Sequence, residues 1–264
     1  MPAYTGGLNE MCFKDRTVII TGGAQGIGAS YARSFAAQGA RLLIADLSQD
    51  AGERLAAELS DSFACEVRFV RVDVSEEAET AAMAAAAADL GHGAIDVLVN
   101  NAALYGQLQG KKPFEDITRE EWDRVMAVNV RGVWNCVKSV VPYMKKRAYG
   151  KIVNIASVVF CTGAQGFAHY VASKAAVVGL TRALARELGP FGVTVNAVSP
   201  GLVTNQSTLI LNTQDYVGRM AGTRALNREM APDDLQGAVL FLASERSNFI
   251  TGQNVIVDGG AVFV

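Results

Sequence analysis

A glycine cluster directly after a β-branched run restricts the fold of this chain more than any other feature. Residues 16–28 read R-T-V-I-I-T-G-G-A-Q-G-I-G, a strand followed by a helix that we expect over residues 29–38. Glycines allow a sharp turn and let the backbone approach a pyrophosphate, whose charge suits a helix N-terminus. Gly22, Gly26 and Gly28 follow a T-G-x-x-x-G-x-G spacing without a Lys-Ser or Lys-Thr, which argues against an ATP-binding phosphate loop. A purely structural turn is the alternative, and the flanking strand and helix favour a nucleotide site.

Apolar strand-like runs alternate with helical segments along the rest of the chain. The predicted strands cover residues 41–45, 67–72, 95–99, 152–155, 193–199 and 253–258, and the predicted helices cover residues 49–59, 76–90, 118–138, 168–188 and 233–243. This alternation predicts an α/β fold, a Rossmann-like doubly wound parallel sheet of about seven strands flanked by helices.

The domain organisation that we expect is simple, because neither a linker-like composition nor an internal repeat divides the chain. Residues 1–12 are expected to form a flexible tail, and residues 13–264 a single Rossmann-fold dinucleotide-binding domain. The segment of about 202–227 has poor periodicity and lies beside the expected crevice, so we interpret it as a substrate lid.

Composition excludes several classes of function. Half of the 264 residues are hydrophobic, which suits a sheet covered on both faces, and the net charge of −2 gives no general attraction to nucleic acid or to a membrane. The start of the chain lacks the pattern of a secretory signal, and the four cysteines are scattered, so we expect reduced thiols and a cytoplasmic protein. Neither histidine has a second one at ligand spacing, so we expect no metal site.

The predicted helix over residues 168–188 carries the first catalytic candidates. Tyr170 and Lys174 are one turn apart and therefore share a face. A phenol has an unperturbed pKa of about 10, and a nearby ammonium would lower it, so the pair is a candidate proton shuttle. Ser157 ends the strand before this helix and could hold a carbonyl oxygen, although a lone serine is more often a turn or capping residue.

Polar side chains follow several of the predicted strands. Asp46 ends the second strand, where a dinucleotide fold places the acid that binds the adenosine ribose, and its charge would repel a 2′-phosphate. Because Leu47, Ser48 and Gln25 offer no compensating cation, we expect NAD rather than NADP. Asn129 lies inside the helix predicted from residue 118 and needs a backbone or water partner there.

The motifs occur together in the order T-G-G-A-Q-G-I-G, N-N-A, Asn129, Ser157, Y-V-A-S-K and S-P-G. With this joint pattern, nearly the whole chain resembles the short-chain dehydrogenase/reductase family. The resemblance implies that Tyr170 is the general base in alcohol oxidation and the acid in ketone reduction. It also implies that Lys174 lowers the pKa of Tyr170 and holds the nicotinamide ribose, that Ser157 polarises the substrate oxygen, and that Asn129 positions Lys174 through a water molecule.

The resemblance further implies cofactor contacts on the phosphate, adenosine, ribose and nicotinamide portions of NAD. These contacts are Gly22, Gln25, Gly26, Ile27, Gly28, Asp46, Leu47, Asp73, Val74, Asn100, Ala102, Tyr170, Lys174, Pro200, Val203 and Thr204. One departure is Ala103, which stands where the family usually has a glycine. Similar proteins usually form tetramers, so we expect a homotetramer whose subunits pack through the helices around Asn129 and Tyr170.

The expected reaction is reversible hydride transfer between NAD and a secondary alcohol or its ketone. Substrate contacts are expected from Ser157, Val159, Gln165, Tyr170 and Leu202, with Phe160, Phe167 and the segment up to Met220 nearby. Because this set is mostly apolar, it favours a cyclic or aromatic alcohol. Alternatives are a 3-oxoacyl-carrier-protein reductase, which would favour NADPH, a polyol or sugar dehydrogenase, and a catalytically silent dinucleotide-binding sensor.

Overall fold

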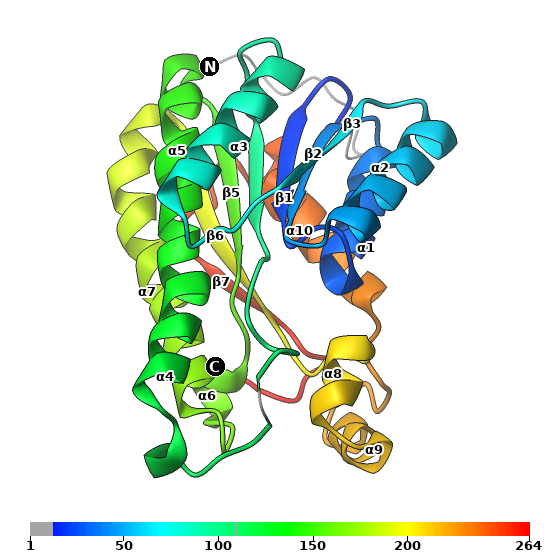
Figure 1. The fold of residues 1–264 in the computed structure, drawn as a ribbon, viewed down its shortest axis with the longest axis vertical. Helices are drawn as coiled ribbons and strands as arrows, with labels where there is room; N and C mark the ends of the chain where they lie inside the picture. The colour runs from blue at the N-terminus through cyan, green and yellow to red at the C-terminus, as the bar shows by residue number, and fades with distance from the viewer. Residues whose placement is uncertain (1–12, 109) are drawn as a thin grey trace.

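The computed structural model describes residues 13–108 and 110–264, so the tail expected over residues 1–12 lies outside the described residues. Seven parallel strands form one sheet in the order β3-β2-β1-β4-β5-β6-β7 (Figure 1). Helices cover both faces of this sheet, and the predicted doubly wound fold class is confirmed. The strands are β1 (Thr17–Thr21), β2 (Arg41–Asp46), β3 (Val67–Arg71), β4 (Val97–Asn100), β5 (Gly150–Ile155), β6 (Val193–Pro200) and β7 (Asn254–Val257).

Strands β1, β4, β5 and β6 are buried along their whole length because helices cover both faces of the sheet, whereas the edge strand β3 exposes Arg68 and Arg71. In β1, Val18 and Ile20 face one hydrophobic core and Ile19 faces the other. The first core is covered by α1 (Gly26–Ala36), α2 (Gln49–Phe63) and α10 (Gln236–Ala243). The second is covered by α3 (Glu77–Leu90), α5 (Gly132–Arg147) and α7 (Ala168–Leu188), which lie on the opposite side of the sheet in Figure 1.

The topology determines where a ligand can bind. The chain winds outward from β1 through β2 to β3, and then returns to place β4 beside β1. The loops that leave β1 and β4 therefore diverge at the carboxyl edge of the sheet, which is the usual ligand-binding crevice of open α/β sheets. The loop that follows β5 reaches the same edge.

Most of the predicted helices differ from the observed ones at their ends or within their length, and two of these helices border the site. The first was predicted from residue 29, whereas α1 begins at Gly26, because the glycines themselves form its first turn. The helix predicted from residue 118 begins as α4 (Arg119–Met126) behind a capping box at Thr118, becomes the π-helix η2 (Ala127–Arg131), and continues as α5. The α7 helix has the predicted bounds.

Two short helices occupy the segment expected to form a lid. They are α8 (Gln206–Leu211) and α9 (Gln214–Gly222), and each begins at a side-chain cap, Asn205 and Thr213 respectively. Figure 1 shows both below the carboxyl edge of the sheet, away from the two layers of long helices. Within the part of the chain that the structure describes, no helix combines the length and the apolar character needed to cross a membrane.

Candidate active site

A cavity of about 1410 Å³ opens at the carboxyl edge of the sheet. The loops after β1, β2, β3, β4, β5 and β6 contribute to its walls, together with α8 and α9. Most of the residues predicted to bind a cofactor or substrate line it. They are Gly22, Gln25, Gly26, Ile27, Gly28, Asp46, Leu47, Asp73, Val74, Ala102, Ser157, Val159, Gln165, Tyr170, Lys174, Pro200, Leu202 and Val203.

The loop between β1 and α1 has the backbone geometry of a phosphate cradle. Gly22 and Gly26 have φ values of 61° and 55°, which favour glycine. A Cβ at Gly28 would lie 2.0 Å from the carbonyl oxygen of Gly22, so no side chain fits there. At Gly26 the nearest atom to such a Cβ is 4.0 Å away, and a side chain would project into the cavity. The loop therefore leaves its backbone accessible to a ligand.

The N-terminus of α1 faces this cavity without a side-chain cap. Its N-cap residue is Gln25, whose backbone is extended and whose side chain makes no capping hydrogen bond. The amide of Gln25 instead donates to Ser48 Oγ at 3.3 Å. Because the first N–H groups of a helix carry partial positive charge and need acceptors, this terminus fits a pyrophosphate.

Asp46 lies at the end of β2, beside the glycine loop. Its Oδ2 accepts a hydrogen bond from the N–H of Ala24 at 3.0 Å, and its Oδ1 accepts one from the N–H of Ser48 at 3.0 Å. The carboxylate is therefore held in place at the cavity wall by both neighbouring loops. Leu47 beside it is 54% exposed and lines the same end of the cavity.

Asp73 and Val74 form the wall after β3. Asp73 Oδ1 accepts from both the N–H and the hydroxyl of Ser75, at 2.9 and 2.7 Å, which fixes a tight turn. Asn135 on α5 donates to the carbonyl of Val74 at 3.0 Å. The turn is therefore rigid and presents an apolar side chain and a carboxylate to the cavity, as expected for an adenine contact.

Two of the residues predicted to contact the cofactor, Asn100 and Thr204, do not line the cavity. Asn100 does not line the cavity, because its side chain lies in the sheet and donates to Asn154 Oδ1 at 2.9 Å. Asn101 lines the cavity instead, and its amide donates to the carbonyls of Thr21 and Gly22 at 3.1 and 2.8 Å. The next residue in the chain thus ties the β4 loop to the glycine loop.

Thr204 also lies outside the cavity wall. Its hydroxyl donates to Glu229 Oε2 at 2.9 Å, and its N–H donates to the carbonyl of Met230 at 2.8 Å. Both partners belong to the segment before α10. The side chain predicted to contact a nicotinamide is therefore occupied in fixing the base of the lid segment. Phe160, which was expected near the substrate, is likewise not among the lining residues.

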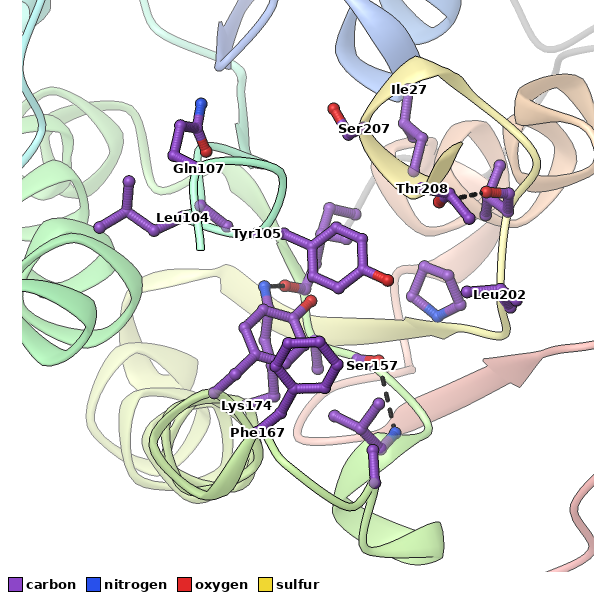
Figure 2. Close-up of a pocket in the computed structure, with 18 of the residues that line it drawn as sticks. Ile27, Leu104, Tyr105, Gln107, Ser157, Phe167, Lys174, Leu202, Ser207 and Thr208 are labelled. Carbon is purple, nitrogen blue, oxygen red and sulfur yellow. Dashed lines mark hydrogen bonds between the residues drawn. The ribbon is translucent and has the colours of Figure 1, made fainter. Parts of the chain in front are cut away.

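The catalytic candidates from β5 and α7 meet at the cavity. Ser157 and Tyr170 both line it, and the Ser157 hydroxyl lies close enough to lower the pKa of the Tyr170 phenol. Lys174 is buried one turn along α7, and its Nζ lies 5.7 Å from the Tyr170 ring centroid and donates to the carbonyl of Ile155 at 2.7 Å. Figure 2 shows Ser157 and Lys174 on either side of the aromatic cluster that faces the open space. The three groups therefore share one small region of the cavity.

Burial controls the protonation of this pair in the isolated protein. It raises the pKa of Tyr170 above its ordinary value, and the nearby Tyr105 raises it further, whereas the hydrogen bond with Ser157 lowers it. Burial also lowers the pKa of Lys174 to about 8. The sequence predicted a lowered tyrosine pKa from the neighbouring ammonium. Desolvation of the buried phenol is the larger effect on the pKa of Tyr170.

Asn129 has direct hydrogen-bond partners in the β4 loop and on α7. Its Oδ1 accepts from the N–H of Leu104 at 2.7 Å, and its Nδ2 donates to Ser173 Oγ at 3.0 Å. The side chain is buried and does not line the cavity. It lies in the π-helical turn η2, a feature that often marks functional sites. Asn129 thus joins the β4 loop to α7 between Tyr170 and Lys174.

The sequence analysis did not identify Tyr105. This residue follows the N-N-A-A segment and lines the cavity with its ring centroid 5.2 Å from that of Tyr170 and 6.2 Å from that of Phe167. The sequence signal for Tyr105 is weak, because no local pattern indicates whether an aromatic side chain five residues after an apolar strand points into a binding cavity. Ala103, the departure from the family pattern, also lines the cavity.

Comparisons with known proteins match almost the entire chain. The family described as "Enoyl-(Acyl carrier protein) reductase" matches residues 22–262. A protein named "Probable galactose dehydrogenase GalD" from Rhizobium meliloti (strain 1021) is 36% identical, over 94% of this chain and 95% of its own. A "3-alpha-(or 20-beta)-hydroxysteroid dehydrogenase" from Mycobacterium bovis (strain ATCC BAA-935 / AF2122/97) is 37% identical, over 94% and 89%. The crystal structure of levodione reductase has a TM-score of 0.87 at 32% identity and covers 94% of this chain and 97% of that one.

Proposed function

Because the chain belongs to the short-chain dehydrogenase/reductase family, we propose that it transfers a hydride reversibly between NAD and a cyclic secondary alcohol or its ketone. It is a short-chain alcohol dehydrogenase or ketone reductase that uses a nicotinamide dinucleotide. The preference for NAD, the ring-bearing substrate and the roles of individual residues are proposed below this level of description.

One observation carries the proposal. The hydroxyls of Tyr170 and Ser157 lie, with Lys174, in the same cavity as the uncapped start of α1 and the glycine loop. A proton-transferring group, a polarising hydroxyl and a phosphate cradle therefore face a common space. A sensor that only binds a dinucleotide has no use for the first two groups, so this arrangement favours an enzyme.

Tyr170, Ser157 and Lys174 have separate roles in the proposed proton transfer. Tyr170 takes the alcohol proton in oxidation and returns it in reduction, and Ser157 donates a hydrogen bond to the substrate oxygen. Lys174 supplies a positive charge that favours the phenolate form of Tyr170 and lies where it can hold a ribose. When bound, the nicotinamide cofactor accepts or supplies the hydride.

NAD is proposed over NADP because of Asp46. Its carboxylate is fixed by Ala24 and Ser48 at the end of the cavity that the glycine loop also lines. A fixed carboxylate can accept hydrogen bonds from ribose hydroxyls and repels a phosphate at the same position. Leu47 and Gln25, the neighbouring side chains at this end, provide no positive charge.

A ring-bearing substrate is proposed from the apolar character of the walls around Tyr170. Tyr105, Phe167 and Leu202 line this region, as Figure 2 shows. The hydroxysteroid relative is named for an alcohol that carries rings. A sugar is the second candidate, because the relative named as a galactose dehydrogenase is similarly close and because Gln165 and Asn205 add polar groups to the lining.

We also propose a homotetramer in the cytoplasm. The α4 and α5 helices expose Trp122 and Trp134, which are 40% and 43% exposed, on the side of the sheet that also carries α7. Large aromatic side chains on a helical face are typical of subunit contacts. Cys65, Cys136 and Cys161 are free thiols, in keeping with a reducing compartment.

The direct test is a screen of cyclic, acyclic and sugar alcohols with NAD and with NADP at mildly alkaline pH, recording nicotinamide absorbance. We expect NAD-dependent oxidation that is fastest with a cyclic secondary alcohol. Oxidation of a sugar alone would favour the second candidate. If no alcohol is oxidised and no ketone is reduced, although the chain binds NADH, the proposal is wrong.

A further inference from the structure

Tyr105, Phe167 and Tyr170 form an aromatic cluster. The proposed mechanism gives a role to Tyr170 and none to Tyr105. Its ring is tilted by 43° against that of Tyr170 and by 48° against that of Phe167, and the latter two rings lie 6.5 Å apart. Figure 2 shows the Tyr105 ring directly beside the open space between Ser157 and Leu202. The three rings thus form one continuous apolar wall next to the hydroxyl proposed to transfer the proton.

The backbone of Tyr105 is held on both sides. Leu104, the residue before it, is bonded through its N–H and its carbonyl to the side chain of Asn129, at 2.7 and 3.4 Å. The carbonyl of Tyr105 accepts from the N–H of Leu108 at 3.0 Å, which closes a turn. The position from which the ring projects is therefore fixed relative to α7.

The far end of the Tyr105 side chain is held by the lid segment. Asn212, at the end of α8, donates from Nδ2 to the phenol oxygen of Tyr105 at 3.3 Å, and also to the carbonyl of Thr208 at 3.1 Å. The loop that carries Tyr105 also contacts α8 at a second point, where Gly106 lies against Ser207. A Cβ at Gly106 would lie 3.0 Å from Cβ of Ser207, closer than ordinary van der Waals contact, so the two segments pack tightly here.

Resting on the proposed function, we infer that Tyr105 is a specificity-determining residue that packs against the ring of a cyclic alcohol beside Tyr170. We further infer that the Tyr105–Asn212 hydrogen bond holds its ring in that position. The apolar surface of a saturated ring in this space packs against Tyr105 and Phe167, and removing that surface from water is favourable. A small acyclic alcohol still reaches Ser157 and Tyr170 but covers little of the aromatic wall.

The hydrogen bond can be tested without any substrate. Amide hydrogen exchange over residues 206–211 is measured in the full chain and in the Tyr105→Phe variant, which keeps the ring and removes the hydroxyl. We expect exchange there to be about threefold faster, because a neutral hydrogen bond contributes about that factor. The control is Tyr31→Phe, which removes a buried hydroxyl in the core under α1. Equal exchange in both variants would overturn the inferred role of Asn212.

The specificity is tested by comparing cyclohexanol with 2-butanol in the NAD-dependent reaction. Tyr105→Ala is expected to lower kcat/KM for cyclohexanol about tenfold and that for 2-butanol less than about threefold, with Tyr105→Phe in between. Equal losses for both alcohols would overturn the specificity role and leave the proposed function intact. If the unmodified protein oxidises neither alcohol, the ring-alcohol proposal and the specificity role both fail, and the exchange measurement decides the hydrogen bond separately.

Discussion

Asn129 holds Leu104 at both of its backbone polar groups, with Oδ1 2.7 Å from the N–H and Nδ2 3.4 Å from the carbonyl oxygen. The same amide donates to Ser173 on α7 at 3.0 Å. One buried side chain in the π-helical turn therefore connects the β4 loop to the helix that carries Tyr170. Because it does not itself line the cavity, we propose that it acts as a positioning residue.

Asn129→Ala is expected to reduce both stability and turnover. The N–H of Leu104 would lose its acceptor, which costs about 1–3 kcal/mol of unfolding free energy. A displaced β4 loop would lower kcat by about 10- to 100-fold, since catalytic groups tolerate little misplacement. Urea unfolding and initial rates measure the two effects.

A matched control exists for this prediction. Asn196 on β6 is buried and likewise bonds two backbone groups, accepting from the N–H of Gln253 at 3.0 Å and donating to the carbonyl of Ile250 at 2.8 Å. Asn196→Ala is expected to lose similar stability with kcat unchanged. Equal losses of kcat in the two variants would show that Asn129 matters only for folding.

The contact between Asn129 and Leu104 could not be predicted from the sequence. A mid-helix asparagine among apolar residues indicates that a partner is needed, but the partner is Leu104, 25 residues away in a different loop. Its identity depends on how the β4 loop folds over α4 and α5. Local propensity contains no information about that approach.

The fold could be predicted because its signals are local. Apolar strands alternating with amphipathic helices specify a doubly wound sheet, and α7 was predicted to its ends because small residues at helical spacing run without interruption to Gly189 and Pro190. The orientations of Asn100 and Asn101 were harder to predict, because the side chains of successive strand residues point to opposite faces of the sheet. The sequence alone could not determine which of two adjacent asparagines faces the cavity.

Tyr170→Phe is expected to lower kcat for alcohol oxidation by at least about 100-fold, because proton transfer by a positioned group typically contributes that much or more. Binding of NADH, measured by fluorescence titration, is expected to change little. Tyr31→Phe removes the same atom from the buried core, where its hydroxyl has no partner among the described residues, and should leave kcat unchanged. Near-normal turnover by the Tyr170 variant would remove this residue from its proposed role.

The two directions of the reaction are expected to respond oppositely to pH. Burial raises the pKa of Tyr170, so the phenolate needed for oxidation becomes more populated as pH increases, and the phenol needed for reduction becomes less populated. Oxidation should therefore accelerate as pH rises through about pH 10, whereas reduction should slow only above about pH 10, where the phenol begins to ionise. The hydrogen bond with Ser157 lowers the pKa of Tyr170, so Ser157→Ala should shift both profiles to higher pH. Profiles that do not move would contradict this electrostatic role of Ser157.

Asp46→Ala is expected to reduce the preference for NAD. The change removes a ribose acceptor and the repulsion of a 2′-phosphate, and a charged hydrogen bond of this kind corresponds to about 10-fold or more in kcat/KM. The ratio of kcat/KM for NAD to that for NADP is the decisive quantity, since Asp46 also holds the N–H of Ala24 and both values can fall. Asp61→Ala, on the exposed end of α2, controls for the change in net charge. A native enzyme that already uses both cofactors equally would refute the argument.

Lys151 provides a test of stability far from the cavity. Its Nζ is buried in β5 and has no hydrogen-bond partner among the described residues, and burial lowers the pKa of this lysine to about 8. Glu245 opposes this shift and Arg16 adds to it. A folded-state pKa below the unfolded value of about 10.5 means that the ammonium is penalised only in the folded protein.

Below about pH 8 Lys151 is charged in both states, and the cost of burying its ammonium lowers the unfolding free energy in full. Above about pH 8 the folded protein releases this proton while the unfolded chain keeps it. Lys151 therefore makes the unfolding free energy rise with pH between about 8 and about 10.5. Lys151→Met, which fills the same space without a charge, is expected to flatten this part of the profile and to raise the unfolding free energy at neutral pH by roughly 1–3 kcal/mol. Lys14→Met, at an exposed position, should change neither quantity. Urea unfolding across this pH range measures both, and a Lys151→Met variant that is less stable at neutral pH would show that the ammonium is favourably solvated or paired in the folded protein.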